Sequence, residues 1–344
     1  MPDVEPIALA PTETGGAAPA RHGDRALELA ERFALVGLTA VLIVVFALLP
    51  ASSETFPTVA NLQIVLADQS VLLAISLAVL FPIVTNVWDF SPGATAGLAA
   101  VFAGSVSSGS GSILLGVGAA LLVGVGIGVV NGVLVTVAKI NSVIATFGMT
   151  IVIAGLVQWK TDGNSIVQGI PQGLSDFGSS NLLGVPKIAL VAVALAGIAY
   201  YVLRCTPYGR YLFAIGSNRP AARLVGLRVE WLTFTTFVVA GLLAGIAGAL
   251  LVARTGAGNP LVGPGYTIPA YAAVFLGAVA VQPGRWNVPG VVVAILFLGI
   301  LNSGLTLAGA QTFVNDLANG VALLAGVGVA NLLARHRGRA LTTT

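Results

Sequence analysis

Residues 112–138 read SILLGVGAALLVGVGIGVVNGVLVTVA and contain no charged side chain. An α-helix needs about 20 apolar residues to cross the roughly 30 Å hydrocarbon layer of a bilayer, so this stretch predicts a membrane span. Glycine at every fourth position allows helices to approach closely. Such spacings occur at Gly124, Gly128 and Gly132, and at Gly241 and Gly245. We therefore expect a fold made of closely packed membrane helices.

The composition of the whole chain agrees with that expectation. Of the 344 residues, 56% are hydrophobic and 8% are charged, whereas about a quarter of the residues of a soluble domain are charged. The mean hydropathy is +0.96. The sequence predicts an all-α integral membrane protein and excludes collagen-like, disordered and nucleic-acid-binding classes. Cys205 is the single cysteine, which excludes an intrachain disulfide and a cysteine-based metal cluster.

Hydropathy predicts about ten transmembrane helices. The expected spans are residues 33–50, 64–86, 93–107, 112–138, 142–160, 187–205, 231–253, 266–281, 288–308 and 312–334. The third and eighth spans are short and begin in sequence rich in proline and glycine. Either one is therefore a candidate for a broken or re-entrant helix.

The positive charges predict the orientation, because Lys and Arg beside spans are retained in the cytoplasm. With ten spans and a cytoplasmic N-terminus, only Lys160, Lys187 and Arg254 face outward, leaving 13 of the 16 Lys and Arg inside. We expect both termini in the cytoplasm of a multi-pass protein of the inner membrane. The predicted regions are a cytoplasmic tail (1–32), a transmembrane domain (33–334), an outer loop (161–186), a cytoplasmic loop (206–230) and a second cytoplasmic tail (335–344).

A short internal repeat suggests that the domain consists of two similar halves. Residues 128–134 read GVVNGVL and residues 299–305 read GILNSGL, an offset of 171 residues. Five spans in each half (33–160 and 187–334) would place the halves in opposite orientations, as in inverted-repeat transporters. The alternative is a chance match in a sequence rich in Gly, Val, Leu and Asn.

The sequence offers little support for an enzyme. Both histidines, His22 and His336, fall in the predicted tails, so no histidine is available as an intramembrane base or metal ligand. No Gly-Lys dipeptide occurs, which excludes a P-loop for binding ATP. We expect no catalytic residue, no metal and no cofactor on this chain.

Polar groups inside predicted spans are candidates for a solute path, since ionisable side chains in hydrocarbon are costly and usually face a cavity. Amides and a few carboxylates suit a neutral, hydroxyl-rich solute because they supply both donors and acceptors. The candidates are Asp68, Gln69, Asp89, Asn131, Asn302 and Asp316. The alternative for any one amide is a hydrogen bond that bridges neighbouring helices.

The loop between the sixth and seventh spans carries arginines and also a short helix signal. Asn218 can cap a helix that begins with Arg219 and Pro220, and Gly226 can end it. This helix would present apolar side chains outside the membrane, among them Leu224. The alternative is an ordinary basic inner loop.

This loop resembles the coupling loop in permease subunits of ATP-binding-cassette sugar importers of the ribose, xylose and arabinose type. The matching residues are Gly209, Arg210, Ala214, Ile215, Gly216, Asn218, Ala221, Ala222, Arg223, Leu224 and Gly226. A second match, residues 89–94 (DFSPGA), is similar to an Asp-Leu-Ser-x-Gly segment of the family and adds Phe90 and Ser91 to the candidate path. The resemblance covers roughly residues 60–330, but residues 266–286 depart from the family pattern.

The resemblance implies a transport subunit that moves a monosaccharide or sugar-like polyol. Its implied partners are an ATPase subunit that holds ATP and Mg, an extracytoplasmic sugar-binding protein, a second permease copy and the lipid bilayer, with no nucleic acid. The coupling-loop helix would dock on the ATPase. The departures at 266–286 leave the solute open. An ion-coupled secondary transporter and a membrane scaffold are the alternative functions.

Overall fold

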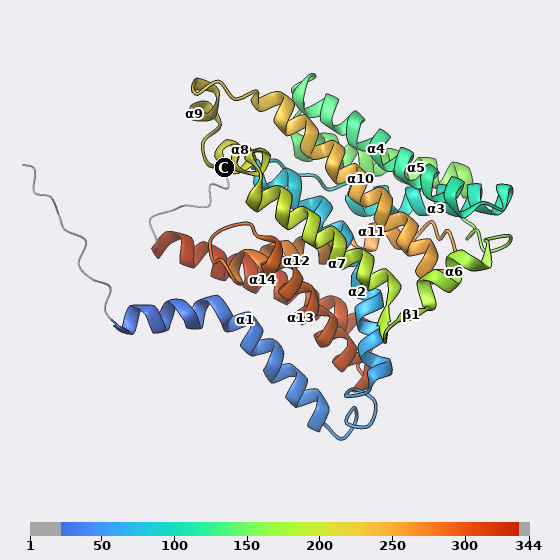
Figure 1. Cartoon of the computed structure of the whole chain (residues 1–344), viewed down its shortest axis with the longest axis horizontal. Helices are drawn as coiled ribbons and strands as arrows, with labels where there is room; N and C mark the ends of the chain where they lie inside the picture. Colours follow the sequence, from blue (N-terminus) through green and yellow to red (C-terminus); the bar gives the residue numbers. More distant parts are fainter. Residues whose placement is uncertain (1–21, 337–344) are drawn as a thin grey trace, which may run out of the picture.

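The computed structural model describes residues 22–336, and the side chains of residues 32–325 and 328. Helices dominate this part of the chain (Figure 1). The first half contains α1 (His22–Leu48), α2 (Val59–Val84), α3 (Pro92–Ser110), α4 (Ile113–Thr136) and α5 (Ser142–Thr161). The connection that follows holds α6 (Gln172–Ser179) and the antiparallel pair β1 (Asn181–Leu182) and β2 (Val185–Pro186).

The second half begins with α7 (Lys187–Tyr200), which runs on into the π-helical turn η1 (Tyr201–Cys205). Two short helices come next, α8 (Pro207–Ser217) and α9 (Arg219–Leu224). The remaining helices are α10 (Val229–Thr255), α11 (Val262–Gly265), α12 (Thr267–Val279), α13 (Val288–Leu307) and α14 (Thr312–His336).

Seven helical stretches in the described part of the chain are long and apolar enough to cross a membrane. They are Val59–Val84, Ile113–Thr136, Ser142–Thr161, Lys187–Cys205, Val229–Thr255, Val262–Val279 and Val288–Leu307. Each coincides with a predicted span. The other three predicted spans are also helical and correspond to α1, α3 and α14. The prediction of a helical integral membrane protein is confirmed.

The two spans expected to be irregular differ from each other. α3 is a continuous helix from Pro92 to Ser110, so a break within the third span is excluded, while a re-entrant third span stays a prediction. The irregular backbone lies just before it, at residues 85–91, because Pro92 suits the first turn of a helix but not its interior. In the eighth span, Tyr266 interrupts the helix between α11 and α12.

The helix α2 occupies the centre of the bundle. From Val71 to Val84 its sequence is apolar apart from Ser76, and every residue from Ser70 to Val84 is buried, as expected for a helix segment surrounded by others. It contacts α7, α10, α12 and α13. Figure 1 shows α4 and α10 side by side in one part of the bundle and α12, α13 and α14 grouped in another.

Close packing of α4 against α10 depends on the predicted glycines. A Cβ at Gly124 would overlap the carbonyl oxygen of Gly241, and a Cβ at Gly241 would overlap that of Gly124. A Cβ at Gly128 would likewise overlap the carbonyl oxygen of Phe237. The predicted role of these glycines in helix approach is confirmed.

Candidate functional site

The helices α8 and α9 form a separate unit between the spanning helices that end at Cys205 and begin at Val229. The side chain of Thr206 accepts a hydrogen bond from the N–H of Gly209 (3.3 Å), and that of Asn218 accepts one from the N–H of Ala221 (2.9 Å). Gly226 has φ +82°, which suits the residue that follows a helix. The predicted Asn218-capped helix is confirmed. Sequence reasoning missed α8, although Thr206-Pro207 carries the same signal of a cap followed by proline.

The outer surface of α9 is apolar and uncovered. Leu224 is 90% exposed and Val225 is 76% exposed. Ala222, on the opposite face, is buried with Ile215 and Val229. Figure 1 shows α9 at one end of the bundle, beyond α8. The unit therefore presents an apolar surface at that end.

Charged residues attach α9 to the beginning of α10. Arg223 forms an ion pair with Glu230, and Lys139 Nζ lies 3.6 Å from a Glu230 carboxylate oxygen. Arg219 Nη2 donates a hydrogen bond to Thr233 Oγ1 (3.3 Å). Partial burial lowers the pKa of the Arg219 guanidinium, while the Glu230 carboxylate acts in the opposite direction. These contacts hold α9 in a fixed position relative to α10.

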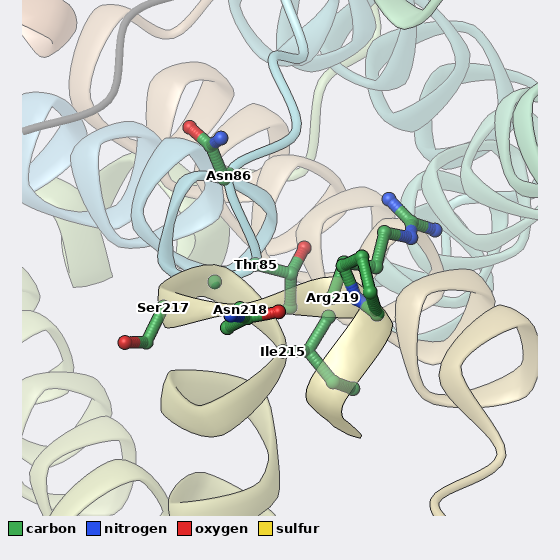
Figure 2. Close-up of a pocket in the computed structure, with 8 residues that line it drawn as sticks. Thr85, Asn86, Ile215, Ser217, Asn218 and Arg219 are labelled. Carbon is green, nitrogen blue, oxygen red and sulfur yellow. The ribbon is translucent and has the colours of Figure 1, made fainter. Parts of the chain in front are cut away.

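A direct backbone contact links the α8–α9 unit to α2. A Cβ added at Gly216 would overlap the carbonyl oxygen of Val84 at the end of α2. Beside this contact lies a cavity of about 310 Å³. Its lining consists of Thr85, Asn86, Ile215, Gly216, Ser217, Asn218, Arg219 and Pro220. Figure 2 shows Thr85 and Asn86 on the backbone that leaves α2, and Ser217, Asn218 and Arg219 at the junction of α8 and α9.

The segment 85–91 leads from this cavity to a buried polar cluster. The carboxylate atom Asp89 Oδ1 accepts hydrogen bonds from Ser91 N (2.9 Å) and Ser91 Oγ (2.7 Å). Asn131 Nδ2, from α4, donates to Ser91 Oγ (2.8 Å). All three side chains are buried. The structure thus brings together three of the predicted path residues.

Aromatic side chains cover the same segment. The Phe90 ring stacks on Tyr271 of α12 at 4.8 Å and on Phe147 of α5 at 4.4 Å between ring centroids. Tyr271 Oη also donates a hydrogen bond to the backbone carbonyl oxygen of Asp89 (2.7 Å). Trp88 packs against Phe275, one turn further along α12. Sequence reasoning missed these partners, although Tyr271 and Phe275 stand at helical i, i+4 spacing.

The predicted path residues on α2, α13 and α14 lie apart from this cluster. Asp68 Oδ1 accepts a hydrogen bond from Arg254 Nε (2.8 Å) in an ion pair between α2 and α10. Asn302 of α13 donates to Asn319 of α14 (3.3 Å). Asp316 is exposed on α14. Asn131 and Asn302 therefore both bridge neighbouring elements, as in the alternative left open by the sequence.

Three of the predicted path residues have a buried side-chain oxygen with no hydrogen-bond partner within the described part of the chain. These oxygens are Gln69 Oε1, Asn131 Oδ1 and Asn302 Oδ1. Buried polar atoms are usually paired, so each of these is an acceptor open to a further donor. Among the described residues, no group of three or more His, Cys, Asp or Glu side chains could hold a metal ion.

An apolar bundle of membrane-length helices with a short helix pair at one end is the architecture of a multi-pass membrane protein. The chain belongs to the family described as "Branched-chain amino acid transport system / permease component", whose model matches residues 61–328.

Named relatives fall in the same class. The ribose import permease protein RbsC of Escherichia coli K12 is 32% identical over 293 residues, covering 84% of this chain and 91% of RbsC. RbsC of Bacillus subtilis is 33% identical, and the match covers 85% of this chain and 90% of that protein. The L-arabinose ABC transporter permease protein AraH of Azospirillum brasilense is 29% identical, covering 94% of each chain. No solved structure matches the chain at a significant level.

Proposed function

We propose that this chain is the permease subunit of an ATP-binding-cassette importer for a monosaccharide or a sugar-like polyol. ATP hydrolysis takes place on a separate ATPase subunit, which holds ATP and Mg, and this chain performs no catalysis. The family and the printed functions of the ribose and arabinose relatives support the proposal. The single observation that carries it is the α8–α9 unit, which exposes Leu224 and Val225 and contacts the end of α2 through Gly216.

The proposed arrangement in the membrane has ten spans and both termini in the cytoplasm of an inner membrane. Placing α8 and α9 inside follows the positive-inside rule. Two inverted halves fit the parallel between Asn131 and Asn302. Each of these repeat-related amides donates a hydrogen bond, and its Oδ1 has no partner among the described residues. A second permease copy completes the path, and an extracytoplasmic binding protein delivers the solute.

The proposed coupling runs from α9 to the segment 85–91. ATP can shift the permease between inward- and outward-facing states only if the ATPase contacts those states differently. Leu224 and Val225 provide the exposed contact, while Arg223 and Glu230 fix α9 to α10. Movement of α8 is transmitted to α2 because Gly216 leaves no gap at Val84. The segment that follows α2 then changes position at the polar cluster.

The polar cluster and its aromatic cover suit a neutral, hydroxyl-rich solute. Amide oxygens such as Asn131 Oδ1 accept hydrogen bonds from hydroxyl groups. The Trp88 and Phe90 rings are only partly buried and present apolar faces. Tyr271, Phe275 and Trp286 belong to the segment that departs from the family pattern, so we place solute selection at this aromatic cover.

The test is reconstitution of the chain with its ATPase and binding protein in proteoliposomes, followed by uptake of labelled sugars. The proposal predicts uptake that requires internal ATP and the binding protein and that persists when an uncoupler removes ion gradients. Uptake that continues without the ATPase but stops with the uncoupler would instead establish the ion-coupled secondary transporter. A stable chain that binds no ATPase and transports nothing would indicate a scaffold.

A further inference from the structure

A second cavity is lined by three arginines, of which Arg210 also belongs to the predicted coupling loop. It has a volume of about 180 Å³ and lies between η1, α8 and the connection from α12 to α13. Arg204, Arg210 and Arg285 line it, each from a different one of these elements. Apolar and aromatic side chains, including Leu203, Phe213 and Trp286, form the rest of the wall.

The backbone segments that carry the three arginines are closely packed. A Cβ at Gly209 would overlap the backbone of Leu203, so η1 and α8 are in direct contact between Arg204 and Arg210. Asn287 Nδ2 donates to the carbonyl oxygens of Gly277 (3.0 Å) and Arg285 (2.9 Å), which fixes the turn that carries Arg285. The guanidinium of Arg285 also lies over the Phe213 ring, 5.6 Å from its centroid.

No described carboxylate neutralises this cluster. The ion pairs within residues 32–325 involve Lys139, Arg223 and Arg254, and none of the three cavity arginines. Three neighbouring guanidinium groups without an ion pair among the described residues form a site for a phosphate group. The planar fork of arginine donates two parallel hydrogen bonds to phosphate oxygens.

The position of the cavity indicates the source of the phosphate. Spanning segments end at Cys205 and begin at Val288, so the cavity lies at the level where helices leave the membrane. Trp286 and Tyr200 in its wall are typical of a membrane interface. Basic cavities between membrane helices at that level bind the head groups of anionic lipids. This step requires only that this end of the bundle lies at a membrane face.

We propose that Arg204, Arg210 and Arg285 bind the phosphate head group of one anionic phospholipid, with its acyl chains lying along the adjoining apolar helices. Phosphatidylglycerol and cardiolipin have the required charge, whereas phosphatidylcholine carries a compensating cation. The bound lipid would join α8 to the α12–α13 connection, two parts of the chain that are far apart in sequence.

The test is native mass spectrometry of the delipidated full-length protein titrated with phosphatidylglycerol, phosphatidylcholine or inorganic phosphate. The expected result is one phosphatidylglycerol bound per chain in preference to phosphatidylcholine, and not displaced by millimolar inorganic phosphate. Arg204→Gln and Arg285→Gln should each weaken binding by roughly fivefold, and Arg204→Lys by less. The matched control, Lys139→Gln with Arg228→Gln, removes two charges near the same end of the bundle but outside the cavity.

Each contrary result identifies a different error. If the control variant loses as much lipid binding as the arginine variants, general surface electrostatics rather than the cavity binds the lipid. If phosphatidylcholine binds with equal affinity, the protein does not recognise the charge of the head group. Inorganic phosphate that binds as tightly as the lipid would make a soluble phosphate compound the ligand. Displacement of the lipid by added ATPase subunit, with loss of ATPase binding in Arg285→Gln, would assign the cluster to the protein partner. Gel filtration of each variant verifies that it folds.

Discussion

Gly216 packs directly against the carbonyl oxygen of Val84, so the end of α8 and the end of α2 meet without an intervening side chain. The motif that contains Gly216 suggested from the sequence that this residue faces the ATPase. The structure turns it toward the membrane helices. The close contact makes Gly216 a connection between the α8–α9 unit and the central helix of the bundle.

The first prediction follows from that contact. Gly216→Ala should separate α8 from α2 and lower the free energy of unfolding by about 1–3 kcal/mol, the usual effect of overpacking. It should also reduce ATP-dependent uptake more than it reduces binding of the ATPase. Thermal unfolding in detergent and uptake in proteoliposomes measure the two effects. Gly155→Ala on α5, where a Cβ meets no neighbouring atom, is the matched control. If the two variants had equal unfolding temperatures and equal uptake, the contact of Gly216 with Val84 would not connect the α8–α9 unit to α2.

The second prediction concerns the exposed surface of α9. Leu224→Glu should weaken ATPase binding by roughly thirtyfold, equivalent to ~2 kcal/mol, because a charge would be buried in an apolar contact. Folding should be unchanged, since Leu224 is 90% exposed. The control is Leu183→Glu at the β1–β2 turn, where the leucine is 98% exposed and lies outside the proposed coupling unit. Surface plasmon resonance with the purified ATPase measures the affinity of both variants. An unaltered affinity for Leu224→Glu would show that the ATPase does not dock on this surface of α9.

The third prediction concerns the buried polar cluster. From the sequence alone, we expect Asp89→Ala to impair transport more than Ser91→Ala. In the structure, the Ser91 hydroxyl donates to Asp89 and accepts from Asn131, so Ser91→Ala leaves the buried Asn131 Nδ2 unpaired among the described residues. Asp89 Oδ1 keeps the hydrogen bond from the Ser91 backbone N–H. We expect Ser91→Ala to lower the free energy of unfolding by about 1–3 kcal/mol and to impair uptake as strongly as Asp89→Ala.

A matched serine variant separates this effect from general loss of a hydroxyl group. Ser110 donates to the backbone of Val106 and is exposed, so Ser110→Ala should unfold at nearly the wild-type temperature. Differential scanning fluorimetry of the two variants checks the comparison. A Ser91→Ala variant as stable as Ser110→Ala would mean that water replaces the lost hydroxyl.

The fourth prediction tests the aromatic cover of segment 85–91. Tyr271→Phe keeps the ring that stacks on Phe90 but removes the hydrogen bond to the Asp89 carbonyl oxygen. Tyr271→Phe should lower the free energy of unfolding by about 0.5–1.5 kcal/mol. Tyr271→Ala should lower it further because this change removes the ring as well. Tyr211→Phe on the exposed face of α8 is the control. If solute selection occurs here, Tyr271→Ala should also change the ratio of uptake rates for two competing sugars.

Some of these features could be predicted from sequence and others could not, for physical reasons. Apolar spans and the Asn218 cap depend on residues close together in the chain. Seven of the ten predicted spans, and the cap, are confirmed in the described part of the chain. The contact of Gly216 with Val84 joins positions 132 residues apart (216 − 84) and leaves no local signal. Asp68 illustrates the same limit, because its partner Arg254 lies on another helix.

The fifth prediction concerns that ion pair. Asp68 was a candidate path residue, but its contact with Arg254 offers a structural role that ties α2 to the end of α10. Because Asp68 is about half exposed, the pair should contribute only about 0.2–1 kcal/mol to the free energy of unfolding. A double-mutant cycle with Asp68→Asn and Arg254→Gln measures that coupling energy. The exchange Asp68→Arg with Arg254→Asp should restore stability and uptake if the pair acts as a link. Restored stability without uptake would return Asp68 to the solute path, because the charge itself would then be needed at its original position.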